Sequence, residues 1–203
     1  MIIKYFDLKK NLNKNTSFFL LYGLNIGLIE ETINNVFKPI FSKNVFNYEE
    51  NEILANIEEF KEDIFNKSFF ENDKLIIINR VTDKILTVIE DIVDKDFTET
   101  AIILKSSNLE KKSKLRNFFE KDKKAIITPF YEDTYQSLMV VAQNFFKEKK
   151  IKISPQNINL IIERSKGNRI SLKNELKKIE SFSLKKLSIE LSDILKLTNL
   201  SEN

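Results

Sequence analysis

The stretch FFLLYGLNIGLIEETINNV, residues 18–36, decides the fold class of this chain. It begins with five consecutive apolar or aromatic residues, Phe18–Tyr22, which is the pattern of a strand buried on both faces. Gly23 ends this run, and apolar residues such as Ile29 and Ile33 then recur at helical spacing. A buried strand, a glycine turn and an amphipathic helix in this order are typical of the opening of a nucleotide-binding α/β domain.

The same stretch lacks the groups that bind a nucleotide phosphate. A phosphate-binding loop has the pattern G-x-x-x-x-G-K-[ST], in which the Lys neutralises charge and the hydroxyl binds Mg²⁺. Counted from Gly23, the last three places hold Leu28, Ile29 and Glu30, and a carboxylate at this place repels phosphate. The third predicted strand also ends in Asn79, where nucleotidases of this architecture hold magnesium with an acidic residue. We therefore expect no ATP hydrolysis, no cofactor and no metal site, with an ATPase of unrecognised site as an alternative.

Strand and helix patterns alternate strictly through the first 130 residues. Short β-branched runs bounded by polar residues predict strands at 18–22, 44–48, 74–79, 100–105 and 124–128. Amphipathic patterns predict helices at 28–37, 52–65, 83–93 and 111–120. Strict alternation favours a parallel sheet with helices on both faces, so the predicted fold class of residues 1–130 is α/β.

After Pro129 the strand patterns stop and only helix patterns follow. The predicted helices lie at 133–147, 155–167, 172–182 and 189–197. Ser154 before Pro155 is a helix start, and Ser188 is placed to cap the last helix. We therefore predict a small all-α bundle over residues 131–203, reached through a short junction.

The composition excludes several kinds of chemistry. The chain has no Cys and no His, which rules out disulfides, thiolate nucleophiles, Ser-His pairs and the common zinc sites. It has no run of about 18 apolar residues, and its start, MIIKYFDLKK, lacks the order of a secretion signal. We expect a cytoplasmic protein without a membrane segment. The net charge of +3 permits contact with nucleic acid without arguing for it.

Four segments of the chain carry a resemblance to one known family. They are FLLYG with LIEETI (19–23 and 28–33), SFF with KLIIIN (68–70 and 74–79), LKSSNLEKKSKLRNFFEK (104–121) and GNRISLKNELKKIESF (167–182). In order and spacing they resemble the delta subunit of bacterial DNA polymerase III, which is part of the sliding-clamp loader. The resemblance covers nearly all of the 203 residues.

The resemblance implies a fold and a role. It implies a P-loop-type, AAA+-like N-terminal domain, followed by a three-helix lid domain, in a protein that does not bind ATP. Such a subunit opens the ring-shaped sliding clamp (beta subunit) so that it can be loaded on primed DNA during replication. Its other partners are the gamma/tau and delta prime subunits of the DNA polymerase holoenzyme, and it has no catalytic site of its own. The family's third, collar domain would begin near Asn203, so the chain is expected to be a fragment or a short relative.

The resemblance also implies a clamp-binding element. In the family, two adjacent apolar residues after a serine insert into a hydrophobic pocket of the clamp, and by position they correspond to Ser68, Phe69 and Phe70. Both phenylalanines stand in a polar segment between a predicted helix and a predicted strand, where loops lie on the surface. Exposed aromatic residues are typical interface anchors. The alternative is that both rings cover the protein's own core.

A basic segment at 105–124 is a second candidate contact surface. It includes Lys111, Lys112, Lys114 and Arg116, for which we consider contact with DNA phosphate or with an acidic neighbouring subunit. The alternative is a solvated helix face, because Leu115 and its apolar neighbours mark the opposite side as core.

Two further positions correspond to nucleotide sensors of AAA+ proteins. They are Ser106–Asn108, after the fourth predicted strand, and Arg169, at the start of a lid helix. Without a phosphate loop there is nothing for them to sense, so we interpret both as helix or turn caps. A general nucleic-acid-binding protein stays open as a further alternative function.

Overall fold

The computed structural model describes residues 1–12, 16–41, 44–65, 74–95, 100–184 and 188–199. The chain divides into two compact units, Met1–Tyr131 and Glu132–Asn203, and each is described by itself. In these described ranges, no helix combines the length and the apolar character that crossing a membrane requires.

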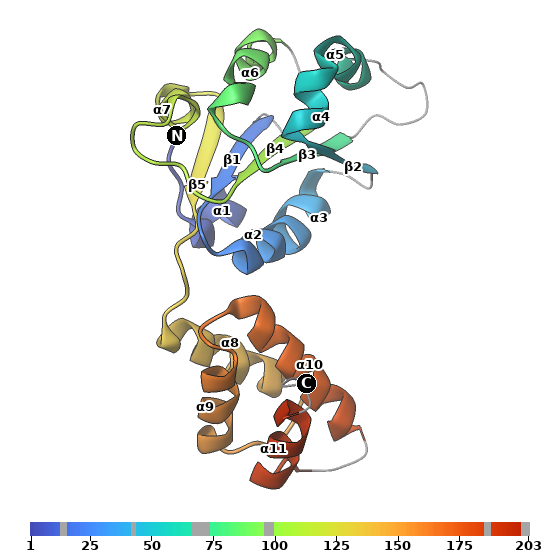
Figure 1. Cartoon of the computed structure of the whole chain (residues 1–203), viewed down its shortest axis with the longest axis vertical. Helices are drawn as coiled ribbons and strands as arrows, with labels where there is room; N and C mark the ends of the chain where they lie inside the picture. The colour runs from blue at the N-terminus through green and yellow to red at the C-terminus, as the bar shows by residue number, and fades with distance from the viewer. Residues whose placement is uncertain (13–15, 42–43, 66–73, 96–99, 185–187, 200–203) are drawn as a thin grey trace. The chain divides into compact units, whose positions relative to one another are not determined.

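The first unit is built on a five-stranded parallel sheet (Figure 1). Its strands are β1 (Phe18–Tyr22), β2 (Asn44–Glu49), β3 (Lys74–Asn79), β4 (Thr100–Ser106) and β5 (Ala125–Pro129). Their spatial order is β2-β3-β4-β1-β5, and all neighbouring pairs are parallel. The predicted α/β class with a parallel sheet is therefore confirmed.

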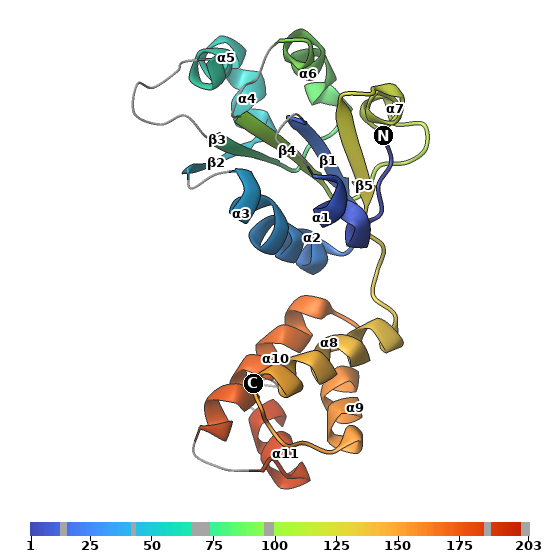
Figure 2. The ribbon, with the colours of Figure 1, turned by 180° about the vertical axis from the view of Figure 1, so that it is seen from behind.

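Helices cover both faces of the sheet (Figures 1 and 2). One face carries α4 (Glu50–Ala55), α5 (Ile57–Phe65), the 3₁₀ turn η3 (Asp83–Ile85), α6 (Leu86–Val93) and α7 (Lys114–Lys121). The other carries η1 (Tyr5–Asp7), α1 (Leu8–Asn11), α2 (Ile26–Thr32), the π-helical turn η2 (Ile33–Phe37) and α3 (Lys38–Phe41). Because both faces are covered, every residue of the interior strand β1 is buried.

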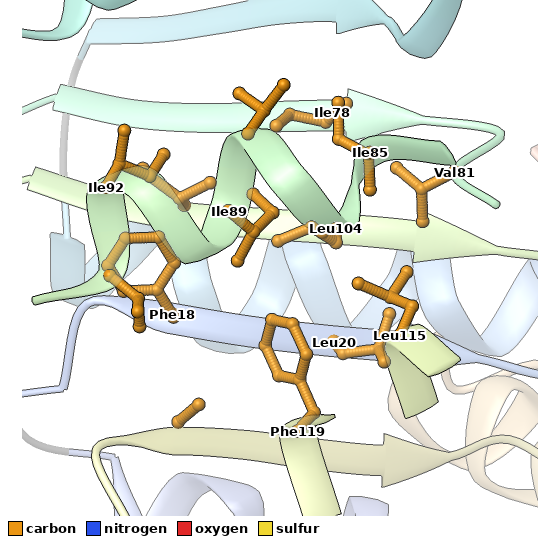
Figure 3. Packing of buried hydrophobic residues seen from close by; sticks show 14 of the residues in the cluster. Phe18, Leu20, Ile78, Val81, Ile85, Ile89, Ile92, Leu104, Leu115 and Phe119 are labelled. Carbon is orange, nitrogen blue, oxygen red and sulfur yellow. The ribbon is translucent and has the colours of Figure 1, made fainter. Parts of the chain in front are cut away.

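Alternate residues of β1 enter two different hydrophobic cores. Phe18 and Leu20 belong to the core under α4–α7, and Figure 3 shows them beside Ile89 of α6 and Phe119 of α7. Phe19 and Leu21 point to the opposite core, under α1–α3. A strand that is apolar at every position is therefore required at this place in the fold.

The helix predicted at 28–37 is longer than its pattern indicated. It begins at Ile26 and continues through the π-helical turn η2 into α3, which ends at Phe41. Pro39 lies in α3, and a proline ring clashes with the carbonyl four residues earlier in a regular helix. That carbonyl belongs to Asn35, inside the π-helical turn, where the wider spacing relieves the clash.

The second unit is a helical bundle. Its helices are α8 (Tyr135–Glu148), α9 (Pro155–Arg164), α10 (Arg169–Ser183) and α11 (Leu191–Asn199). Ser154 caps α9 as predicted, with its side chain accepting a hydrogen bond from Asn157 N. The described residues thus form four helices, and the three implied by the resemblance are too few. Ile194 of α11 is fully buried in the common core, so the fourth helix is part of the bundle.

The predicted cap at Ser188 is wrong. The last helix begins at Leu191, and Ser188 instead forms an isolated bridge with Lys152. The side chain of Asp193 accepts a hydrogen bond from Glu190 N at 2.9 Å and closes the first turn of α11. The sequence pattern misplaced the start because Ile189 and Glu190 belong to no helix.

Candidate functional site

The turn after β1 is held tightly against the end of β5. Gly23 has φ +140°, and a Cβ at this position would lie 2.0 Å from the carbonyl oxygen of Phe130. Its N–H donates to Ser106 O at 3.2 Å, and Asn25 N donates to Phe130 O at 3.4 Å. The turn therefore closes onto its neighbouring strands instead of opening into a cradle.

Helix α2 begins only three residues after this glycine, and its first turn is capped from within. Asn25 is the N-cap, and its side-chain oxygen accepts a hydrogen bond from Leu28 N at 3.1 Å. The amide nitrogen of the same side chain donates to Tyr131 O at 3.1 Å. Leu28, the sixth place of the phosphate-loop pattern, thus lies inside the helix with its N–H already bonded. This geometry is that of an ordinary strand-turn-helix connection.

Glu30 of α2 forms an ion pair with Lys105 of β4. The Lys105 side chain is 18% exposed, so most of its length is buried beside this carboxylate. Sequence reasoning treated Lys105 as one of several basic residues on a surface segment. In the structure it lies near the carboxyl end of the interior strand β4, and the half-exposed carboxylate of Glu30 supplies its counter-charge.

A cavity of about 880 Å³ lies at the carboxyl ends of β3 and β4. It is lined by residues 79–84, which begin with the last residue of β3, by residues 105–110 and 112–113, which begin with the last two residues of β4, and by Ile26 and Glu49. In open α/β sheets, ligand sites occur at this edge, outside the ends of the strands. The Ser106 hydroxyl donates to Val81 O at 2.9 Å and joins the two loops, so its interpretation as a cap is wrong. Ser107 and Asn108 are exposed beside it.

Asp83 fastens the same two loops together. Its carboxylate accepts hydrogen bonds from the Ser113 hydroxyl at 2.6 Å, Leu115 N at 3.0 Å and Lys114 N at 3.0 Å. The Ser113 bond first, and then the Leu115 N–H, hold the pKa of this carboxyl below its usual range. Since Asp83 takes the first amides of α7, this helix start is closed by a side chain of the protein itself. Sequence reasoning missed Asp83, which lies 30 positions from Ser113.

Replacing Asp83 with alanine is expected to lower the free energy of unfolding by about 1–2 kcal/mol, because the first two N–H groups of α7 and the Ser113 hydroxyl lose their acceptor. The pKa of Asp83 is lower in the folded state than its unfolded value near 4. Its contribution is therefore complete above about pH 4 and is lost as the pH falls through the folded-state pKa. Urea unfolding of both proteins between pH 7 and pH 2 measures this difference.

Asp94→Ala is the matched control, since Asp94 forms an exposed ion pair with Lys124. It should change the free energy of unfolding by less than about 0.5 kcal/mol. A constant difference between wild type and Asp83→Ala from pH 7 to pH 2 would contradict the assignment.

The predicted basic contact residues fall into two groups. Arg116 is turned into the molecule, where its Nε donates to Glu120 at 2.8 Å and its guanidinium lies 5.1 Å from the ring centre of Tyr22. Lys111, Lys112 and Lys114 are exposed, and Lys112 forms a surface ion pair with Glu110 at 2.9 Å. Arg116 therefore supports the fold, whereas the three lysines stay available to a partner.

Two basic residues that sequence reasoning missed share the cavity with Lys112. Arg80 and Lys84 follow β3, and both line its wall. Arg80 has φ +54°, is 82% exposed at its side chain and donates to Glu49 at 2.8 Å. No sequence pattern could bring them beside a lysine about 30 positions further along the chain. Only the parallel pairing of β3 with β4 does so.

The proposed clamp-binding residues Ser68, Phe69 and Phe70 lie outside the described residues. The described chain ends α5 at Phe65 and resumes at Lys74, the first residue of β3.

Arg169 is not a cap. Asn168 caps α10, and its side chain accepts a hydrogen bond from Ser171 N at 2.9 Å. The Arg169 guanidinium instead makes a bidentate pair with Asp133, with N–O distances of 2.7 and 2.6 Å. Both side chains are buried within the helical unit, so the pair fastens the start of α8 to the start of α10.

Comparisons with known proteins place the fold. No protein-family model and no curated protein matches the sequence. Among solved structures, the chain is similar to the Bacillus subtilis DNA clamp loader delta protein, with a TM-score of 0.60 and 17% identity over 95% of this chain. It is also similar to a RuvB mutant of Thermotoga maritima, with a TM-score of 0.58 and 15% identity over 97% of this chain. A third similar structure is domain III of the Thermotoga maritima replication initiation protein DnaA, with a TM-score of 0.50 and 13% identity over 95% of this chain.

These likenesses concern the fold, which is an α/β domain of AAA+-like type, and in this chain that domain is followed by a helical unit. At 13–17% identity they show the fold alone. The chain spans 60% of the delta protein, 65% of the RuvB protein and 87% of the DnaA domain.

Proposed function

We propose that this chain is a delta-type subunit of a bacterial sliding-clamp loader, which binds and opens the clamp without hydrolysing ATP. One observation carries the proposal: an AAA+-like domain in which Asn25 caps α2 and bonds the Leu28 N–H at the place of a phosphate loop. The four sequence segments of the delta family and the likeness to a clamp loader delta protein support it. A domain of this kind acts through a partner rather than through a bound nucleotide.

Phe69 and Phe70 are the proposed anchors in the clamp. Burial of one or both rings in a hydrophobic pocket supplies roughly 2–5 kcal/mol. A ligand shifts a conformational equilibrium only by its different affinities for the two states. The subunit therefore opens the ring by binding the open interface more tightly than the closed one. The further partners in this proposal are the gamma/tau and delta prime subunits and primed DNA, in the cytoplasm.

The double substitution Phe69→Ala, Phe70→Ala is expected to weaken binding to the cognate sliding clamp by about 30-fold or more, which corresponds to the loss of about 2 kcal/mol. Fluorescence anisotropy with labelled clamp measures the dissociation constant. Tyr131→Ala is the control, because Tyr131 is an aromatic residue with 79% of its surface exposed. Tyr131→Ala should leave the affinity for the clamp unchanged. If the double variant bound the clamp as tightly as the wild type, the assignment of Phe69 and Phe70 as clamp-binding residues would be wrong.

A general nucleic-acid-binding protein is a second candidate function. It is favoured by the convergence of Arg80, Lys84 and Lys112 on one cavity, next to the exposed Lys111 and Lys114. Binding to DNA that falls steeply with salt, together with no affinity for the clamp, would favour this function. An increase in melting temperature with magnesium and ATP would instead favour a degenerate ATPase.

A further inference from the structure

The two edges of the sheet are protected differently. At the β5 edge, residues 1–3 add a short parallel pairing, with Ile3 N donating to Ile127 O at 2.9 Å and Ile127 N to Met1 O at 3.0 Å. At the other edge, β2 pairs with β3 in parallel register. Within the described ranges, no strand pairs with the outer side of β2. This outer side is a place where a further strand can be added.

The strand β2 carries none of the usual obstacles to pairing. Its sequence, NVFNYE at 44–49, contains no Lys, Arg or Pro, and those are the residues that block edge-to-edge contact. The strand is six residues long, which is enough for several main-chain hydrogen bonds. Phe46, near the centre of the strand, is 38% exposed. An exposed aromatic residue on an unobstructed edge marks an interaction surface.

The side chains on one face of this edge form an aromatic surface next to α5. Phe46 and Tyr48 are two residues apart and therefore lie on the same face. The Tyr48 ring packs edge-on against Phe60 of α5, with 5.3 Å between ring centres. The Tyr48 hydroxyl donates to Asp63 at 3.2 Å. Burial, and then the charge of Asp63, raise the pKa of Tyr48, so its hydroxyl stays a donor at neutral pH.

The charges next to the aromatic surface of Phe46 and Tyr48 are carboxylates, which favour a cationic partner. A cavity of about 240 Å³ is lined by Tyr48 and Phe60 and by the acidic residues Glu52, Glu59 and Asp63. Glu52 accepts a hydrogen bond from Glu49 N in the first turn of α4, and one oxygen of Asp63 accepts the Tyr48 hydroxyl. Glu59 and the other oxygen of Asp63 are the groups that can face a ligand.

The rest of this helix pair has the same sign of charge. Residues 50–65 contain six carboxylates and a single Lys, at position 61. Lys61 is engaged by two ion pairs, with Glu58 and with Asp91. Outside these two helices, Lys74 donates to Asp63 O at 2.8 Å and Arg80 pairs with Glu49. Carboxylates still outnumber the cations beside the β2 edge, which favours positively charged chains and disfavours nucleic acid.

We propose that the outer edge of β2 is a docking site for an extended, Lys- or Arg-bearing segment of a partner protein. The segment adds a strand to the sheet through main-chain hydrogen bonds. One of its cationic side chains lies over the rings of Phe46 and Tyr48 and reaches the carboxylates of Glu59 and Asp63. The main chain provides affinity, and the carboxylates determine which sequences bind. This site is independent of the proposed role in clamp opening.

The test uses two ten-residue peptides that alternate Thr with Lys or Thr with Glu, at low ionic strength. The Lys peptide is expected to bind at least about tenfold more tightly than the Glu peptide. The double variant Glu59→Gln, Asp63→Asn should lower that affinity about tenfold. The double variant Glu148→Gln, Glu163→Gln changes two carboxylates of the helical unit and should leave it unchanged.

A second variant separates strand addition from charge attraction alone. Phe46→Lys places a cation on the half-exposed edge, and it is expected to reduce binding about tenfold without changing the melting temperature. In the wild-type protein, hydrogen exchange of the β2 amides should slow when the Lys peptide is added. The proposal is overturned if neither peptide binds at millimolar concentration, if both bind equally, or if the β2 amides that point away from β3 are already protected in the free protein.

Discussion

Replacing Gly23 with alanine is expected to destabilise the α/β unit by about 3 kcal/mol or more. A Cβ on this residue would lie 2.0 Å from the carbonyl oxygen of Phe130 and 2.7 Å from its carbonyl carbon. These are main-chain atoms at the end of β5, so they cannot turn away as a side chain would. The residue also has φ +140°, which side chains rarely tolerate. Both effects raise the free energy of the folded state. Relieving the contact with Phe130 would require β1 to move away from β5.

Hydrogen exchange under increasing urea measures this loss for the amides of the first unit separately. Gly167→Ala is the matched control, because Gly167 also has a positive φ, +75°, but no atom lies within 4 Å of the place that a Cβ would occupy there. Strain alone should cost the helical unit about 1–2 kcal/mol. If the two substitutions lower the free energies of unfolding of their units equally, the close approach at Gly23 does not contribute to stability.

Replacing Arg169 with methionine is expected to destabilise the helical unit by about 3–5 kcal/mol, which makes it the second large effect. Asp133 and Arg169 are 3% and 7% exposed at their side chains, and the bidentate contact has distances of 2.6 and 2.7 Å. Asp133 also accepts a hydrogen bond from the Ser137 hydroxyl at 2.6 Å. Removal of the guanidinium leaves a buried carboxylate without its main counter-charge, which is more costly than losing an exposed pair.

Circular dichroism during urea unfolding measures this change, with Lys178→Met as the control. Lys178 pairs with Glu175 at 2.8 Å one helical turn away, and its side chain is 42% exposed. Its loss should cost less than about 0.5 kcal/mol. The double variant Asp133→Asn, Arg169→Met should recover part of the stability, because no unpaired charge is left inside. If Arg169→Met were as stable as Lys178→Met, the pair of Asp133 and Arg169 would contribute nothing to stability.

The strands could be predicted from the sequence because both faces of the sheet are buried. Residues 18–22 and 74–79 are strands with the predicted bounds. The strands predicted at 44–48 and 100–105 each extend one residue further, and the last strand is shifted by one residue, from 124–128 to 125–129. Such runs need no alternation to be recognised. The helix starts were harder to predict than the strands. The helix after the basic loop begins at Lys114 instead of residue 111, since its cap is Ser113.

The groups that organise the candidate site could not be predicted. Glu30 and Lys105 are 75 positions apart, and Asp133 and Arg169 are 36 positions apart. No local spacing connects such partners, because the sheet order and the bundle packing bring them together. The sequence alone showed that the phosphate-loop motif is absent. The closure of that turn by Asn25 was visible only in three dimensions.

The division of β1 between two cores has a consequence for how this protein can change during evolution. Inserting or deleting one residue in 18–22 would exchange the side chains offered to α6 and α7 with those offered to α2 and α3. Each set contains a phenylalanine and a leucine, yet they pack against different residues in the two cores. Homologous chains should therefore tolerate substitution in this segment but keep its length constant, and indels should accumulate in the connections between elements.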